Sequence, residues 1–255
     1  MPKPIVLITG ASAGIGAACA RAFARAGFDL VLTARRRERL EALAAELSGA
    51  CSARVLPLTL DVRDRKAVEK TLGDLPRDFA AVEVLINNAG LGRGLDKLHE
   101  GNVDEWDEMV DTNLKGLLYV TRAVLPGMVA RGKGHVIQIG SVAGREVYPG
   151  GNVYCATKFA VKALSRAMKM DLLGTPIRVS TVDPGMVETE FSVVRFRGDR
   201  ERAAKVYAGL KPLSPEDIAE IVLWVASRPP HVDISEVVVM PTAQSSAMLA
   251  HRSEP

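Results

Sequence analysis

The chain has 255 residues, with 33 lysines and arginines against 30 aspartates and glutamates, which gives a formal net charge of +3. This near balance argues against nucleic acid as a partner, and no apolar run approaches the roughly 20 residues that a membrane-spanning helix needs. The three cysteines and four histidines are scattered, so we expect no disulfide framework and no metal site. Because the N-terminus also lacks a signal-peptide layout, a soluble cytoplasmic protein is predicted.

A glycine-rich turn lies between the first predicted strand and the first predicted helix. Residues 4–8 are an apolar run typical of a buried strand, and residues 15–26 have helical periodicity. Glycines between them allow the backbone to approach a pyrophosphate, while the helix N-terminus presents free N–H groups to it. A dinucleotide site is therefore predicted, with a plain tight turn as the alternative. Its candidate residues are Gly10, Ser12, Gly14, Ile15 and Gly16.

The second predicted strand, residues 29–34, ends at a run of arginines. A site for NAD would place Asp or Glu near this point to hold the ribose 2′-hydroxyl, whereas this chain has Arg35 and Arg36. Guanidinium groups bind phosphate through bidentate, charge-assisted bonds. We therefore predict NADP, with Arg35 as the strongest candidate for the 2′-phosphate. The alternative, a solvated basic start to the next helix, fits Arg37 and Arg39 better.

A serine, a tyrosine and a lysine follow in the second half of the chain. Ser141 comes just after a predicted strand at residues 135–139, and Tyr154 and Lys158 open a predicted helix at residues 153–173. Positions i and i+4 share a helix face, so the phenol and the ammonium are predicted neighbours. A nearby cation favours the phenolate and lowers the pKa of a tyrosine. Tyr154 is thus predicted to exchange a proton with a substrate oxygen near neutral pH.

Apolar strands alternate with helical stretches along the whole length, and we find seven strand candidates, the last at residues 236–240. This alternation predicts an α/β fold: a single Rossmann-type doubly wound domain over residues 1–255, with a seven-stranded parallel sheet and helices on both faces. Residues 102–131 and 153–173 are predicted to form two long helices. Ser141 and Pro184 follow strand candidates, and ligands of such sheets bind beyond the carboxyl ends of the strands.

Several motifs, in this order, resemble the short-chain dehydrogenase/reductase family over essentially the whole chain. The motifs are T-G-x-x-x-G-x-G, Asn87-Asn88-Ala89-Gly90, Asn113, Ser141, Tyr154-x-x-x-Lys158 and Pro184-Gly185. Further stretches are similar to one branch of it, the NADP-dependent 3-hydroxy acid dehydrogenases that include serine and L-allo-threonine dehydrogenases. These stretches are residues 119–128, 150–154, 189–196 and 240–245.

The resemblance implies a catalytic tetrad of Asn113, Ser141, Tyr154 and Lys158. In it Tyr154 is the general acid in reduction and the base in oxidation, and Ser141 hydrogen-bonds the substrate oxygen. Lys158 lowers the pKa of Tyr154 and binds the nicotinamide ribose, and Asn113 holds a water behind it. The resemblance also implies contacts with the adenine, with the wall beside the cofactor and with the nicotinamide carboxamide. The residues implied are Asp61, Val62, Asn87, Ala89, Gly90, Pro184, Gly185, Val187 and Thr189.

Two arginines are candidates for binding a substrate carboxylate. Arg145 stands four residues past Ser141, and Arg195 stands in the segment of residues 190–211. That segment combines glycines with dense charge and is predicted to be a lid that closes over the substrate and excludes water. The alternatives are surface positions for both arginines and an ordinary surface excursion for the segment.

The predicted function is that of an NADP-dependent oxidoreductase acting on a small 3-hydroxy acid or 3-hydroxy amino acid. One alternative is an NADPH-dependent reductase of another carbonyl, such as a 3-oxoacyl thioester or a ketone. The least favoured alternative is a non-catalytic NADP-binding sensor, because fold alone does not fix function. The resemblance further implies a homo-oligomer, usually a tetramer, formed through the two long helices.

Overall fold

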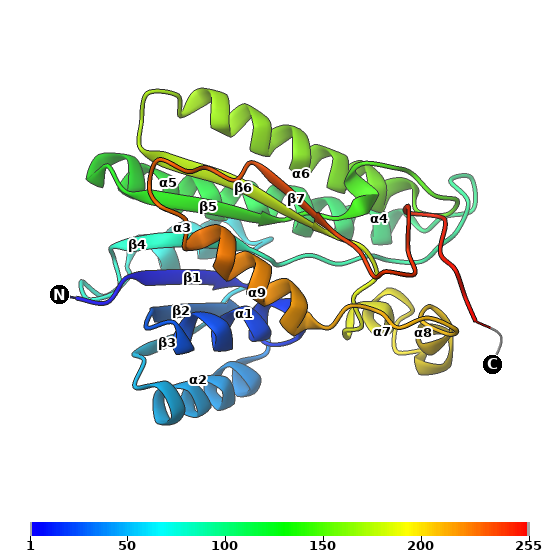
Figure 1. Cartoon of the computed structure of the whole chain (residues 1–255), viewed down its shortest axis with the longest axis horizontal. Coiled ribbons are helices and arrows are strands. Elements are labelled where there is room, and N and C mark those ends of the chain that lie inside the picture. The colour runs from blue at the N-terminus through cyan, green and yellow to red at the C-terminus, as the bar shows by residue number, and fades with distance from the viewer. Residues whose placement is uncertain (1, 254–255) are drawn as a thin grey trace.

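The computed structural model describes residues 2–253 and contains a seven-stranded sheet in the order β3-β2-β1-β4-β5-β6-β7 (Figure 1). All neighbouring strands are parallel. The predicted sheet is therefore confirmed, with strand ends within about two residues of those expected from the sequence. The strands are β1 (Ile5–Thr9), β2 (Asp29–Ala34), β3 (Val55–Thr59), β4 (Val82–Asn87), β5 (Gly134–Ile139), β6 (Ile177–Pro184) and β7 (Glu236–Val239).

Helices cover both faces of the sheet, as the alternation of strands and helices predicts (Figure 1). Strand side chains alternate between two buried clusters, because successive residues of a strand point to opposite faces. Val84 and Ile86 of β4 belong to one cluster, and Leu85 belongs to the other. The first cluster packs on α1 (Gly14–Arg25), α2 (Arg37–Cys51) and α9 (Pro215–Ala226), and the second on α3 (Arg65–Gly73), α5 (Leu117–Arg131) and α6 (Asn152–Asp171).

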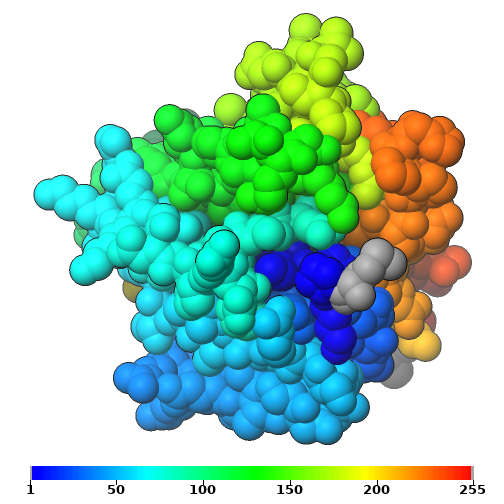
Figure 2. All heavy atoms as spheres, turned by 90° about the vertical axis from the view of Figure 1, so that its left-hand side faces the viewer, coloured from blue at the N-terminus to red at the C-terminus, as the bar shows by residue number. Residues whose placement is uncertain are grey.

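Successive strands are added on one side of β1 up to β3 and on its other side from β4 onward, so the strand order reverses at β1. This strand pairs with β2 on one side and with β4 on the other. Figure 2 shows the end of the molecule at which β1 begins, with the N-terminal residues near the centre of that face. At the opposite end, the loops after β1 and β4 are joined: Thr9 Oγ1 accepts hydrogen bonds from the backbone N–H groups of Asn88 and Ala89, each 3.0 Å long. Ligands of doubly wound sheets bind at such a reversal.

The predicted helix at residues 102–131 is continuous but contains a π-helical turn. It consists of α4 (Val103–Val110), the π-helix Asp111–Gly116 and α5. Such insertions are frequent at functional sites because they redirect side chains within a helix. The segment of residues 190–211 contains two short helices, α7 (Phe191–Arg195) and α8 (Arg200–Lys205). Within residues 2–253, no helix is long and apolar enough to cross a membrane.

Candidate active site

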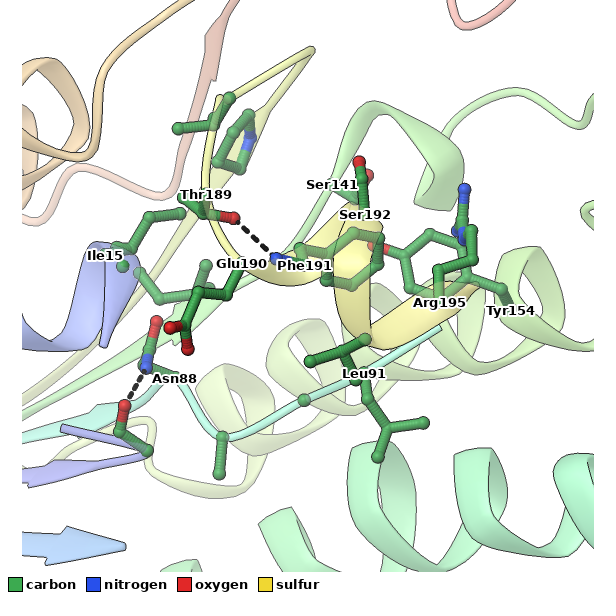
Figure 3. A pocket seen from close by; sticks show the side chains of 18 of the residues that line it. Ile15, Asn88, Leu91, Ser141, Tyr154, Thr189, Glu190, Phe191, Ser192 and Arg195 are labelled. Atoms are coloured by element: carbon green, nitrogen blue, oxygen red, sulfur yellow. Dashed lines mark hydrogen bonds between the residues drawn. The ribbon is translucent and has the colours of Figure 1, made fainter. Parts of the chain in front are cut away.

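A cavity of about 550 Å³ opens beyond the carboxyl ends of the strands (Figure 3). Its wall combines the glycine-rich turn, the loops after β2 to β6, and the segment of residues 190–211. Most of the residues predicted from the sequence meet in this wall. They are Gly10, Ser12, Gly14, Ile15, Arg35, Arg36, Asp61, Val62, Ala89, Gly90, Ser141, Tyr154, Lys158, Pro184, Gly185, Val187, Thr189 and Arg195. Gly16, Asn87, Asn113 and Arg145 do not line the cavity.

The glycine-rich turn leaves the N-terminus of α1 open to an anion. No side chain caps this helix, and its first turn has no acidic residue, so its N–H groups and its dipole favour negative charge there. Gly10 adopts a positive φ of +66°, and a Cβ on it would lie 2.9 Å from Asn88 Nδ2. A Cβ on Gly16 would lie 2.5 Å from the carbonyl oxygen of Gly10. Gly16 thus permits helix and turn to pack closely, and the open turn fits a pyrophosphate.

The arginines after β2 surround the outer end of the cavity. Arg36 donates from Nε to Ser12 Oγ at 3.1 Å and from Nη1 to Glu190 at 2.7 Å. Arg39, which the sequence assigns to a solvated helix face, donates to the same carboxylate at 2.7 Å. Within residues 2–253, Arg35 forms no ion pair, so its guanidinium can bind an anion without displacing a carboxylate. This arrangement fits a 2′-phosphate held by Arg35, Arg36 and Ser12.

Ser141, Tyr154 and Lys158 lie together at the inner end of the cavity. Ser141 begins a short 3-10 helix (Val142–Gly144), and its Oγ accepts a hydrogen bond from the N–H of Ala143 at 3.1 Å. Tyr154 and Lys158 share one face of α6 and are only 9% and 8% exposed. Lys158 Nζ lies 5.9 Å from the centre of the Tyr154 ring and donates to the carbonyl of Ile139 at 2.9 Å.

Asn113 lies behind this group, in the π-helical turn. Its Oδ1 accepts from the N–H of Leu91 at 2.8 Å, and its Nδ2 donates to the carbonyl of Leu91 at 2.8 Å and to Thr157 Oγ1 at 3.1 Å. A Cβ on Gly90 would lie 3.2 Å from Asn113 Oδ1 and 3.8 Å from Lys158 Nζ. Asn113 is therefore next to Lys158 but joins the loop after β4 to α6 rather than lining the cavity.

Burial controls the acidity of the tyrosine and of the lysine. It raises the pKa of Tyr154, and the charge of Arg195 and hydrogen bonding by Ser141 act in the opposite direction. It also lowers the pKa of Lys158 to about 8, against the attraction of Asp183. Each shift has the sign expected when a low-dielectric environment disfavours the charged form. The lowering of the Tyr154 pKa by Lys158 stays a prediction: in this structure burial has the largest effect on that pKa, and Arg195 is the first of the groups that oppose it.

Of the two arginines predicted to meet a substrate carboxylate, only Arg195 reaches the cavity. Its guanidinium lies 4.9 Å from the centre of the Tyr154 ring, and Nη2 donates to the hydroxyl of Tyr148 at 3.0 Å. Its Nε is buried and has no hydrogen-bond partner among residues 2–253. A guanidinium in the wall of a cavity favours an anionic ligand such as a carboxylate.

The predicted role of Arg145 does not agree with the structure. Its guanidinium forms ion pairs with Asp183 of β6, at 2.7 Å, and with Glu236 of β7. Both carboxylates belong to the last two strands of the sheet, and Arg145 points toward them rather than into the cavity. Asn87 is also structural: its Nδ2 donates to Thr121 Oγ1 of α5 at 2.9 Å. Neither side chain is available to a ligand in the cavity.

Sequence reasoning missed several residues of the cavity wall. Phe191 packs against Tyr154 with ring centres 5.5 Å apart, and Tyr148 holds Arg195 as described. Gln244 Oε1 accepts from the N–H of Met186 at 2.8 Å, which links the C-terminal part to the loop after β6. Gln244 stands in a stretch noted for its resemblance, but nothing local predicts its contact. In the part of the chain that the structure describes, no group of three or more His, Cys, Asp or Glu residues is placed to hold a metal ion.

Comparison with known proteins agrees with the geometry of the site. A family model described as short chain dehydrogenase matches residues 4–199. An NADP-dependent 3-hydroxy acid dehydrogenase of Salmonella typhi is 51% identical over 251 residues, which cover 98% of this chain and 100% of the relative. One of Schizosaccharomyces pombe is 46% identical and covers 98% and 96%.

Solved structures of short-chain dehydrogenases are also similar to this chain. A closed form of serine dehydrogenase complexed with NADP+ superposes with a TM-score of 0.91 at 46% identity, covering 98% of this chain and 100% of that one. Serine dehydrogenase from Escherichia coli has a TM-score of 0.82 at 44% identity, with coverage of 94% and 99%. Together with the family model over residues 4–199, these matches confirm the resemblance found in the motifs. The chain therefore belongs to the short-chain dehydrogenase family.

Proposed function

We propose that the protein is an NADP-dependent oxidoreductase that interconverts the alcohol of a small 3-hydroxy acid or 3-hydroxy amino acid with the matching carbonyl. The observation that carries this proposal is the position of Arg195, whose half-buried side chain lines the cavity with its guanidinium beside Tyr154. A cation beside the proton-transfer group favours a substrate that carries a carboxylate near its reacting alcohol. The 3-hydroxy acid dehydrogenases at 46% and 51% identity support the same substrate class.

We assign the proton and the developing charge to the chain's own residues. Tyr154 takes the proton of the alcohol during oxidation and returns it during reduction. Ser141 is the second donor to the substrate oxygen and stabilises the charge that develops on it. Lys158 holds the nicotinamide ribose, and Asn113 holds a water behind Lys158. NADP, when bound, supplies the hydride acceptor or donor.

The cofactor assignment is supported by the open N-terminus of α1, which follows β1, and by the guanidinium of Arg35, which follows the neighbouring strand β2. The first feature suits the pyrophosphate and the second suits the 2′-phosphate. The proposed cofactor residues are Gly10, Ser12, Gly14, Ile15, Arg35, Arg36, Asp61, Val62, Ala89, Gly90, Tyr154, Lys158, Pro184, Gly185, Val187 and Thr189.

Replacing Arg35 with serine is expected to weaken NADP+ binding about 10- to 100-fold, because a charge-assisted hydrogen bond to the phosphate is lost. Binding of NAD+, which has no 2′-phosphate, should change little. Dissociation constants of both cofactors measure the effect. Arg37→Ser is the matched control, since Arg37 is exposed and paired with Glu41 within α2. Equal weakening of NADP+ and NAD+ binding would show that Arg35 does not read the phosphate.

A substrate panel tests the proposed function directly. NADP+ reduction is followed by absorbance with L-serine, L-allo-threonine, 3-hydroxypropionate, 3-hydroxybutyrate and a neutral secondary alcohol, each repeated with NAD+. We expect turnover of the acids with NADP+ and little with NAD+. Turnover of the neutral alcohol alone would reject the carboxylate class and redirect the search to ketones and acyl thioesters. No turnover at all would favour the sensor alternative.

We also propose a single catalytic domain whose residues 190–211 act as a lid, in a homotetramer of the cytoplasm. The lid is supported by the contact of Arg36 and Arg39 with Glu190 on one side and by the ion pair of Arg197 with Glu105, 2.7 Å long, on the other. A tetramer is supported by large apolar side chains exposed along α5 and α6. They are Leu118, Val129, Phe159 and Met170. Sedimentation of the purified protein measures the oligomeric state.

A further inference from the structure

Three consecutive residues of the loop after β4 contact the part of the chain that carries Arg195. Gly92 leaves space for the guanidinium, since a Cβ there would lie 2.7 Å from Arg195 Nη2. The side chain of Arg93 donates a hydrogen bond to the carbonyl of Val194. The N–H of Gly94 donates to the carbonyl of Arg195 at 3.2 Å. This loop therefore supports both the guanidinium of Arg195 and the backbone from which it extends.

The guanidinium of Arg93 is engaged on both of its sides. Its Nε and Nη2 donate to the two carboxylate oxygens of Glu108 on α4, at 2.7 and 3.0 Å, and its Nη1 donates to the carbonyl of Val194. The side chain of Arg93 is 13% exposed, and that of Glu108 is 18% exposed. Two parallel charge-assisted hydrogen bonds fix the plane of a guanidinium, so the remaining donor is aimed at the carbonyl.

We propose that Arg93 is a positioning residue that holds Arg195 at the cavity, where the Arg195 guanidinium meets the carboxylate of the substrate beside Tyr154 (Figure 3). Arg93 does not line the cavity and acts through the backbone of residues 194–195. A displacement of about 1 Å can weaken a directed contact by up to about 100-fold, so this anchor bears on substrate binding. The inference rests on the proposed function, in which the substrate is an acid.

The segment has a second tie to α4, and it is the more exposed of the two. Arg197 pairs with Glu105 at 2.7 Å, but the side chain of Arg197 is 58% exposed, and exposed ion pairs contribute little. In the first tie, hydrogen bonds from Arg93 lower the pKa of Glu108. That carboxylate is therefore charged at neutral pH, and we expect the anchor of the segment at Arg93.

Arg93→Met tests the inference by separating substrate binding from the other steps. We expect KM for a 3-hydroxy acid to rise about 10-fold, because Arg195 loses its fixed place. The value of kcat and the dissociation constant of NADP+ should change little. Arg21→Met is the matched control, since Arg21 of α1 forms the same two-bond pair with Glu46 of α2, at 2.7 and 2.8 Å, outside the cavity wall. It should leave all three constants unchanged.

Glu108→Gln distinguishes positioning from a change of charge. Arg93→Met makes the region more negative, and Glu108→Gln makes it more positive. An effect of the field alone on an anionic substrate would therefore raise KM in the first variant and lower it in the second. Loss of the anchor raises KM in both, because an amide offers only one oxygen to the guanidinium. A lowered or unchanged KM in Glu108→Gln would overturn the inference.

A double variant shows whether Arg93 acts through Arg195. Arg195→Met alone should raise KM for the acid, and adding Arg93→Met should raise it no further, because no guanidinium is left to position. Residues that act independently have effects that multiply in KM. A KM of the double variant equal to the product of the two single effects would contradict the inference and leave the proposed function intact.

Hydrogen exchange decides the question if the wild type turns over no 3-hydroxy acid and the proposed function fails. Amide exchange in residues 191–197 should be faster in Arg93→Met than in the wild type and in Arg21→Met, because the segment loses its anchor. Equal exchange in all three proteins would overturn the inference. Glu108→Gln takes the place of Arg93→Met in this measurement if Arg93→Met does not fold.

Discussion

Replacing Tyr154 with phenylalanine is expected to reduce turnover at least about 1000-fold, because the proton-transfer group itself is removed. Binding of NADP+ should remain nearly intact. The ring stays in place, so its packing against Phe191 and Arg195 is kept and only the hydroxyl is lost. Steady-state kinetics with a 3-hydroxy acid, together with cofactor titration followed by nucleotide fluorescence, measure the two effects separately.

Tyr119→Phe is the control for that experiment, since Tyr119 lies on α5 outside the cavity wall and loses the same hydroxyl. It should retain wild-type kinetics. If Tyr154→Phe keeps activity within tenfold of the wild type, another group must transfer the proton, and the assignment of Tyr154 is rejected. Loss of NADP+ binding along with activity would instead point to a damaged fold.

A methyl group added at Gly140 is expected to lower the free energy of unfolding by about 1–3 kcal/mol, the usual range for overpacking a tight site. A Cβ there would lie 1.9 Å from Asp183 Oδ1. The carboxylate cannot move aside easily, because Arg145 holds it at 2.7 Å. Gly140 also precedes Ser141, so any shift of the backbone displaces that hydroxyl. Urea unfolding and kcat measured on Gly140→Ala check both consequences.

Gly49→Ala should instead raise the free energy of unfolding. Gly49 lies in α2 with open space around the position of a Cβ, and alanine in a helix is more stable than glycine by about 0.5–1 kcal/mol. The pair compares the same chemical change in two environments. A Gly140→Ala variant as stable and active as the wild type would show that the carboxylate of Asp183 does not confine this turn.

The sequence predicts those parts of the structure that depend on near neighbours in the chain. The strand predicted at residues 29–34 has the same bounds as β2, because the apolar run favours a buried strand and the arginines after it mark its end. The placement of Ser141 and Tyr154 in one cavity follows from their positions at a strand end and a helix start.

Contacts between distant segments escape such reasoning. Arg36 and Glu190 are far apart in the chain, yet their side chains meet at 2.7 Å. Arg145 follows Ser141 as closely as a pocket residue would, but one turn of 3-10 helix points it at Asp183. The pKa of Tyr154 is raised by burial and lowered by Arg195, forty-one positions later in the chain. The direction in which a loop leaves a strand decides these cases, and no local pattern encodes it.

The position of β1 between β2 and β4 has a consequence for folding. Ile5 pairs with Asp29 on one side but with Val82 on the other, so the second neighbour arrives only after a long stretch of chain has been made. Closing such a loop costs conformational entropy before its contacts are gained, and folds rich in non-local pairing fold slowly. During synthesis, the glycine-rich turn after β1 therefore remains supported on one side only until residues 82–87 have emerged.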